Sequence, residues 1–193
     1  MNLYSFENQI IGENIFLDVL SNHVKPNNKI YIEADLMKFG KILCYNRKIF
    51  FNSFLNIFKQ ITQENGNISM PSFSYSFGSN NKKKIFSKED TVTPLSSFNE
   101  FFRLQKDAHR SNDPMYSVTS IGALSKELTS ISNNSFGKNS FYENFHKVNG
   151  KLITFGLGKF DPTFVHYIEN YFDTHYEKIE YRFNKKFEGH IID

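Results

Sequence analysis

Two side chains capable of acid–base chemistry lie three residues apart near the end of the chain, at His166 and Glu169. A helix would place both on one face, because residues three apart are neighbours on a helix surface. Imidazole, with an ordinary pKa of about 6.5, can take a proton from an amine near neutral pH. A half-buried histidine satisfied by a carboxylate explains the pair equally well, so its place in the fold must decide.

The elements around this pair predict a strand, a glycine turn and a helix. Residues 151–155 form an apolar run rich in branched and aromatic side chains, followed by Gly156 and Gly158. Asp161 or Thr163 could cap the helix that carries the pair, and the proline between them suits a first helical turn. In open α/β sheets, binding sites lie beyond the carboxyl ends of the strands.

Strand and helix patterns alternate along the rest of the chain. Ser97 and Glu100 have the spacing of a capping box. Periodicity predicts strands over 29–33, 68–75, 118–121 and 177–187, and helices over 14–23, 47–63, 96–103, 123–128 and 140–148. This order favours an α/β fold, a three-layer αβα sandwich with a mixed central sheet, and 193 residues suit a single domain over 1–193.

Composition excludes several classes of protein. A formal charge of +3 with scattered basic residues gives little support for a nucleic-acid partner. The lysine run 82–84 is best explained as a solvated surface, with phosphate binding as a secondary role. One cysteine, Cys44, fits a reducing compartment. Without an apolar run long enough for a bilayer or a secretory pattern at the N-terminus, we expect a cytoplasmic protein with no membrane partner.

Common catalytic motifs are missing. The chain has no P-loop, no Rossmann glycine fingerprint, no HExxH, no CxxC pair and no GxSxG elbow. The glycine turn of the common acetyl-CoA acetyltransferase fold is also missing. We therefore expect no metal site with a local signature.

An ordered series of segments carries a resemblance to the aminoglycoside 3-N-acetyltransferase family. Each segment alone is weak, and their order makes the series fairly specific. The segments are KIYIEADLMKFG at 29–40, MPSFS at 70–74, the stretch from Thr93-Pro94 to Arg103, RSNDP at 110–114 with Ser117 and Gly122, Phe136-Gly137 with Ser140, and GKLITFG at 150–156 with Thr163 and HYIE at 166–169.

The resemblance implies an acetyl-CoA-dependent N-acetyltransferase in which His166 is the general base. Glu169 would orient the imidazole or bind the cationic acceptor. Arg110, Ser111 and Ser117 would lie near the phosphate and pantetheine groups of acetyl-CoA, although a surface loop whose arginine pairs with a carboxylate is the simpler explanation. The loop after the first family strand would bind the thioester or pantetheine arm, through Ala34, Asp35, Leu36, Phe39 and Gly40.

Departures from the family pattern keep other functions open. Glu33, Asp35, Ser97 and Asp113 replace residues usual in the family, and the C-terminal part of the family fold is expected to be absent. The acceptor would be an aminoglycoside or an amino sugar of a surface polysaccharide, including a nucleotide-linked one, because the chain is slightly basic. The alternative is a catalytically degenerate member that binds CoA or a partner. A different acyl group and a homodimer are also open.

Overall fold

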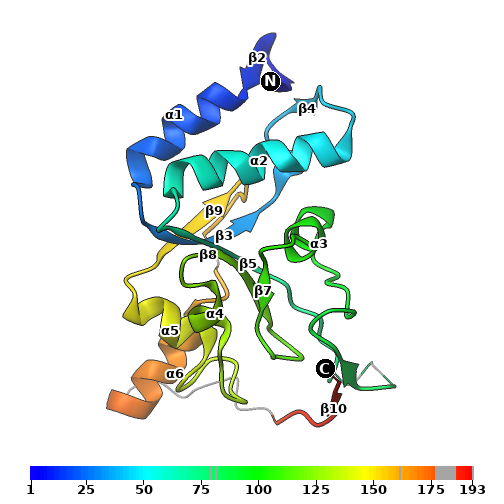
Figure 1. Cartoon of the computed structure of the whole chain (residues 1–193), viewed down its shortest axis with the longest axis vertical. Helices are drawn as coiled ribbons and strands as arrows, with labels where there is room; N and C mark the ends of the chain where they lie inside the picture. Colours follow the sequence, from blue (N-terminus) through cyan, green and yellow to red (C-terminus); the bar gives the residue numbers. More distant parts are fainter. Residues whose placement is uncertain (79, 81, 161, 177–185, 193) are drawn as a thin grey trace.

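The computed structural model describes residues 1–78, 80, 82–160, 162–176 and 186–192. Its centre is a five-stranded sheet in the order β7-β8-β5-β3-β9 (Figure 1). These strands are β3 (Lys29–Ala34), β5 (Asn67–Pro71), β7 (His109–Arg110), β8 (Val118–Gly122) and β9 (Lys151–Phe155). β3 runs parallel to β5 and β9, whereas β8 runs antiparallel to β5 and β7. The predicted mixed sheet is confirmed.

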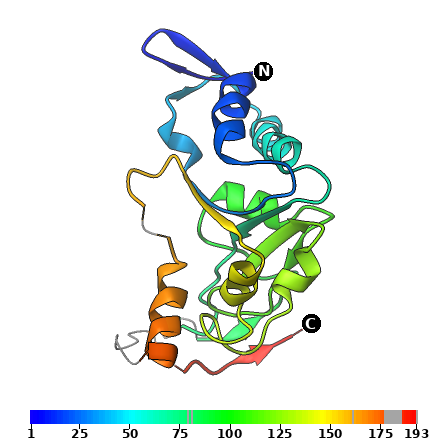
Figure 2. The ribbon, with the colours of Figure 1, turned by 90° about the vertical axis from the view of Figure 1, so that its left-hand side faces the viewer.

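Helices cover both faces of this sheet, as the three-layer prediction requires (Figures 1 and 2). One layer holds α1 (Glu13–His23), α2 (Arg47–Thr62) and α3 (Ser97–Arg103). The other holds α4 (Ser125–Thr129), α5 (Phe141–Lys147) and α6 (Val165–Tyr176). Alternation along β3 explains the two layers, because Ile30 and Ile32 enter the core beneath α1 and α2, whereas Tyr31 enters the core beneath α5.

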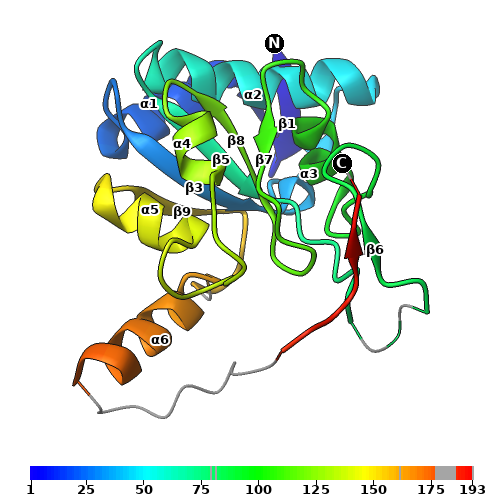
Figure 3. The ribbon, with the colours of Figure 1, turned by 60° about the horizontal axis from the view of Figure 1, so that its bottom comes forward.

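Short elements lie outside the main sheet. β1 (Asn2–Phe6) and β2 (Gln9–Gly12) form a hairpin, to which β4 (Lys41–Ile42) pairs. The short 3₁₀ helix η1 (Leu36–Lys38) follows β3. β6 (Ile85–Phe86) pairs in parallel with β10 (His190–Ile191), so the end of the chain lies beside residues 85–86 (Figure 3).

Two details of the predicted elements need correction. The N-cap of α3 is Ser96, whose hydroxyl accepts the Asn99 N–H at 3.1 Å. The capping box expected at Ser97 is therefore wrong by one residue, because the Glu100 carboxylate is engaged by Arg103 and by the Thr93 N–H. The strand predicted over 68–75 ends at Pro71, which cannot extend the ladder through an N–H of its own. The strand predicted over 177–187 falls almost entirely outside the described residues.

Candidate active site

His166 lies in the first turn of α6, shortly after the carboxyl end of β9. Gly156 ends the strand with φ of +77°, and a Cβ atom there would lie 2.3 Å from the Asp35 carbonyl oxygen, so the turn requires glycine. The segment that follows leaves the sheet edge and returns to α6 (Figure 2). The predicted strand, turn and helix are confirmed, although the candidate cap Asp161 lies outside the described residues.

The structure brings the two predicted catalytic side chains together. His166 Nδ1 lies 3.3 Å from Glu169 Oε2, and the two side chains are 26% and 25% exposed. A proton on Nδ1 donated to the carboxylate leaves the lone pair on Nε2, the nitrogen that would accept a proton from a substrate. The pair is therefore half-buried and accessible, as a general base needs to be.

Glu33 ties the start of α6 to the sheet. Glu33 is the penultimate residue of β3, and its carboxylate accepts the Thr163 N–H at 3.0 Å. Thr163 in turn accepts the His166 N–H through its carbonyl at 3.1 Å. The contact of Glu33 with Thr163 therefore fixes the backbone on which His166 is carried.

Aromatic rings form a wall beside the imidazole. Phe136 meets the His166 ring edge-on with centroids 5.3 Å apart, and Tyr116 meets Phe136 at 4.8 Å. Tyr75, 40% exposed and with φ of +53°, packs against Tyr116 at 5.8 Å. Burial raises the pKa of the Tyr116 phenol to about 12 and that of Tyr75 in the same direction, so both phenols are neutral hydrogen-bond donors at pH 7.

A cavity of about 870 Å³ begins at this wall. Its lining comes from α6, the loop around 132–136, the turn after β7 and the segment 186–191. Its polar lining is rich in amides and carboxylates. Among its lining residues are Asn112, Tyr116, Phe136, Asn170, Asp173 and Glu188.

The loop predicted to bind the thioester is held firmly beside the carboxyl end of β9. Asp35 donates its N–H to the Phe155 carbonyl at 2.8 Å, and its carboxylate accepts the Met37 N–H at 3.0 Å. Phe39 packs against Phe155 with ring centroids 4.7 Å apart, and Gly40 has φ of +125°. The backbone N–H groups of Asp35 and Met37 are thus already engaged within the chain.

The remaining members of that loop take different roles. Ala34 ends β3 opposite Phe155, which places it at the carboxyl end of the strand, beside the turn at Gly156. Leu36 is 5% exposed and belongs to the core, while its carbonyl accepts the Tyr4 hydroxyl at 2.7 Å. Leu36 therefore supports the loop from below.

Arg110, Ser111 and Ser117 form a buried clamp. The Arg110 guanidinium donates to the Ser72 carbonyl at 2.6 Å, to the Ser117 hydroxyl at 3.1 Å and to the Lys88 and Thr91 carbonyls. Burial, with the neighbouring Arg103 charge, lowers the pKa of Arg110 to about 10. Ser111 and Ser117 are 1% and 0% exposed. The contacts of these three residues hold three loops together. The role of Arg110, Ser111 and Ser117 in binding the cofactor stays a prediction.

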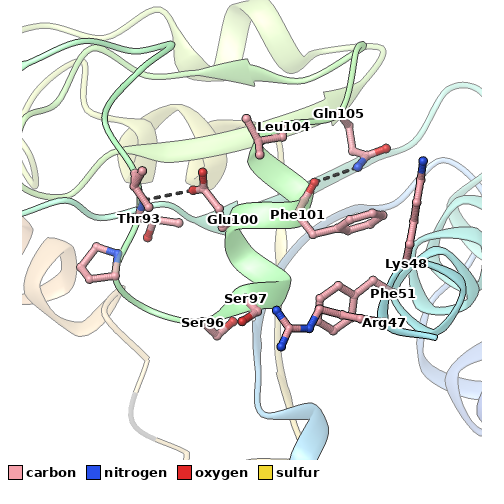
Figure 4. Close-up of a pocket in the computed structure, with 12 residues that line it drawn as sticks. Arg47, Lys48, Phe51, Thr93, Ser96, Ser97, Glu100, Phe101, Leu104 and Gln105 are labelled. Carbon is pink, nitrogen blue, oxygen red and sulfur yellow. Dashed lines mark hydrogen bonds between the residues drawn. The ribbon is translucent and has the colours of Figure 1, made fainter. Parts of the chain in front are cut away.

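A second cavity, of about 980 Å³, lies between the first turn of α2 and α3 (Figure 4). Arg47 and Lys48 project from α2 towards α3, and Phe51 and Phe101 supply aromatic walls. Thr93 borders this cavity and donates its hydroxyl to the Phe73 carbonyl at 2.8 Å. The combination of two cations and two rings suits a ligand with a base and phosphate groups.

Sequence reasoning missed Arg47, Lys48 and the amide-rich lining of the first cavity. The basic pair could have been noticed, because cations in the first turn of a helix interact unfavourably with the helix dipole. Two of them at that position suggest a function such as binding an anion. Asn112 and Asn170 carry no local signal, because only the fold brings them to the same cavity. Among the described residues, no group of His, Cys, Asp and Glu could hold a metal ion, and no helix has the length and apolarity to cross a membrane.

Comparisons with known proteins agree with this architecture. A structure of AAC-VIa bound to sisomicin superposes with a TM-score of 0.70 at 19% identity, covering 82% of this chain and 64% of that one. The aminoglycoside acetyltransferase AAC(3)-IIb gives 0.65 at 22% identity, covering 82% and 63%. AAC-IIIb in a binary complex with CoASH gives 0.63 at 14% identity, covering 75% and 59%.

These likenesses establish the fold, and the chain spans 59% to 64% of the length of the three structures. No curated protein matches the chain. The family model described as aminoglycoside 3-N-acetyltransferase matches residues 32–190, which include His166, Glu169 and the other site residues predicted from the sequence. The chain therefore belongs to the aminoglycoside 3-N-acetyltransferase family.

Proposed function

We propose that this protein transfers an acyl group, an acetyl group in the first instance, from acyl-CoA to the amine of an amino sugar. The observation that carries the proposal is the His166–Glu169 pair, whose Nδ1 and Oε2 atoms lie 3.3 Å apart. The pair follows the carboxyl end of β9 and lies beside a cavity large enough for a sugar. Membership of the family supports the reaction class. A soluble cytoplasmic setting, where acyl-CoA is available, suits this chemistry.

The chemistry follows from the pair. The amine nitrogen attacks the thioester carbonyl carbon, forming the amide C–N bond as the C–S bond breaks. His166 takes the amine proton through Nε2 and returns it to the departing thiolate, so the products are the amide and CoA thiol. Glu169 holds the imidazole in the required tautomer and stabilises the imidazolium that forms.

The acyl-CoA would lie along the carboxyl edge of the sheet. Its thioester would meet the loop from Ala34 to Gly40, which borders the turn at Gly156. Its nucleotide end would occupy the second cavity, with phosphates near Arg47 and Lys48 and the base against Phe51 or Phe101. Arg110 would support this arrangement by fixing the backbone at Ser72 and Thr91.

The test is release of CoA thiol when acetyl-CoA is mixed with a panel of aminoglycosides and amino sugars. His166→Ala is expected to lower kcat by about 10²–10⁴-fold, the usual contribution of a general base, while CoA affinity by calorimetry stays unchanged. His23→Ala is the matched control, because His23 is exposed at the end of α1. Undiminished turnover in His166→Ala would remove the catalytic assignment. CoA binding with no turnover by the wild type would leave only a CoA-binding protein.

The cofactor position has its own test. Replacing Arg47 and Lys48 together by serine is expected to weaken CoA binding by roughly ten-fold, since each exposed charge contact contributes up to about 1 kcal/mol. The affinity for dephospho-CoA should decrease less than the affinity for CoA when the same two residues are replaced. Equal affinity of wild type and variant for both ligands would place the nucleotide elsewhere.

A further inference from the structure

The helix that carries the proposed base, α6, lies beside α5 at the margin of the molecule (Figure 3). Asn170 and Asp173 line the cavity and follow His166 by four and seven residues, the spacing of one helix face. A second face, which includes Tyr167, packs into the core beneath α5, and a third face is exposed at Ile168. The rotation of α6 about its own axis therefore decides whether the imidazole faces the cavity.

The start of α6 is held at Thr163. This residue donates its N–H to the Glu33 carboxylate at 3.0 Å, and its carbonyl accepts the His166 N–H at 3.1 Å. A contact at one end fixes where a helix begins. The rotation of the helix about its axis then depends on contacts further along.

Tyr167 supplies a directional contact one turn after Thr163. Its hydroxyl lies 2.8 Å from Nδ1 of His146, in the last turn of α5. The two rings meet edge-on, with centroids 5.6 Å apart. Burial raises the pKa of the Tyr167 phenol to about 12, so the phenol is neutral at pH 7 and can donate its proton to an unprotonated Nδ1.

This hydrogen bond favours one rotation of α6. Tyr167 is 4% exposed, so a turn of the helix that separated its hydroxyl from His146 would leave the hydroxyl without that partner, at a cost in free energy. The Tyr167 ring also packs against Phe164 and Tyr171, with centroids 5.1 and 6.0 Å apart. Apolar burial depends on the area removed from water and much less on direction. The hydrogen bond therefore adds the angular constraint that packing lacks.

A small rotation of α6 is enough to affect the reaction. An atom about 6 Å from the helix axis, near the outer radius of a helix with its side chains, moves about 1 Å when the helix turns by roughly 10°. Misplacing a reacting group by about 1 Å can lower a rate by about 10²-fold. Because Tyr167 directly follows His166, the backbone that its hydroxyl fixes is the backbone that carries the imidazole.

We propose that Tyr167 is a positioning residue for His166, and that His146 holds the Tyr167 hydroxyl in place. This inference rests on the proposed function and deepens it. The contacts of Thr163 and Tyr167 fix α6 at its start and one turn later, so that the imidazole and Glu169 face the acceptor side of the site. Loss of the hydroxyl should lower kcat and spare the binding of acyl-CoA, whose proposed residues belong to other elements.

The first experiment uses Tyr167→Phe, which removes the hydroxyl and keeps the ring. With acetyl-CoA and the best acceptor of the panel, kcat is expected to fall about ten-fold or more, while the KM for acetyl-CoA stays within about two-fold. Tyr31→Phe is the matched control. Its hydroxyl is also buried and lies 3.3 Å from that of Tyr142, but it belongs to β3. Undiminished kcat in Tyr167→Phe, or equal losses in the two variants, would overturn the proposal.

Variants of His146 distinguish positioning from a general loss of packing. Asparagine places an amide oxygen at about the position of Nδ1, so His146→Asn should keep kcat within about three-fold of the wild type. His146→Leu should lower kcat as much as Tyr167→Phe does. The double variant should be no worse than either, because both changes remove the same bond. An asparagine variant as slow as the leucine variant, or losses that add, would contradict the proposal. His146 is exposed, so this test does not depend on the folding of Tyr167→Phe.

A measurement without turnover separates this inference from the proposed function. The ring C–H resonance of His166 is identified by NMR as the one missing from His166→Ala. It should move in Tyr167→Phe and His146→Leu, and stay in place in His146→Asn and Tyr31→Phe. If no acceptor reacts but the resonance follows this pattern, the catalytic proposal fails and the positioning stands. If the resonance moves in none of the variants, or in all four, the positioning fails whether or not acetyl groups are transferred.

Discussion

Arg110 shows how one residue type can serve two purposes that sequence cannot separate. An arginine in irregular backbone suggested an anion ligand, yet its donors reach three carbonyls in two other segments of the chain, at Ser72 and at Lys88 and Thr91. Those carbonyls come from positions 19 to 38 residues away, so no local pattern could have announced them. By contrast, His166 and Glu169 were predictable because their contact is made within one helical turn.

Replacing Arg110 by lysine tests the clamp. Lysine keeps the charge but cannot reach several carbonyls at once, so about 2–3 kcal/mol of unfolding free energy should be lost as carbonyls go unpaired. Urea denaturation measures the loss. The folded fraction of the variant should bind CoA with the affinity of the wild type. Stability equal to the wild type with CoA binding weakened ten-fold or more would instead support the predicted cofactor role.

At the scale of elements, long periodic segments were predictable and very short ones were not. α1, α2 and β9 appear within one residue of their predicted bounds, because apolar spacing over many residues reports burial. β4, β6 and β7 have two residues each, too few to show a period. The β1–β2 hairpin turns through Glu7 and Asn8, both with positive φ, in a sequence that lacks the usual glycine.

The turn after β9 offers a sharp test of element geometry. Gly156→Ala would force a side chain to φ of +77° with its Cβ against the Asp35 carbonyl, and about 2–3 kcal/mol of stability should be lost. Gly158→Ala is the matched control, since nothing lies within 4 Å of a Cβ there and its stability should be unchanged or slightly higher. Thermal denaturation of both variants measures the difference. Equal midpoints would show that the turn tolerates side chains.

Over the whole molecule, two aromatic cores on opposite faces of the sheet account for much of the phenylalanine content. Phe16, Phe54 and Phe155 belong to the core beneath α1 and α2, and Phe141 and Phe145 to the core beneath α5. Alternation along β3 explains their division, because Ile30 and Ile32 enter one core and Tyr31 enters the other. The amide-rich cavity was beyond prediction, because it needs segments 112–116, 132–136 and 186–191 to meet.

Acid stability is a property of the whole chain that follows from individual carboxylates. A hydrogen bond from the amino terminus lowers the pKa of Glu13, and one from Arg103 lowers that of Glu100, both from about 4.5. Such groups contribute their stability above the usual pKa and lose it as pH falls through the lowered value. The midpoint temperature of thermal unfolding should therefore decrease as the pH is lowered below about 4.5.

Replacing Glu13 and Glu100 together by glutamine should lower the midpoint at pH 7 and flatten its decline below pH 4.5. Glu64→Gln, an exposed change after α2, should leave the wild-type decline in place. Differential scanning calorimetry from pH 7 to pH 3 measures all three. An unchanged slope in the double variant would mean that other groups govern acid unfolding.

The pairing of β3 with β9 has a last consequence for catalysis. Asp35 donates a backbone hydrogen bond to Phe155, and the Glu33 carboxylate accepts one from Thr163. Five residue pairs align the two strands. The loop that would receive the thioester and the helix that bears the imidazole are thus joined to one rigid ladder. Their spacing is set when the chain folds, so in the proposed reaction bringing nucleophile and electrophile together would require ordering of the substrates far more than of the protein.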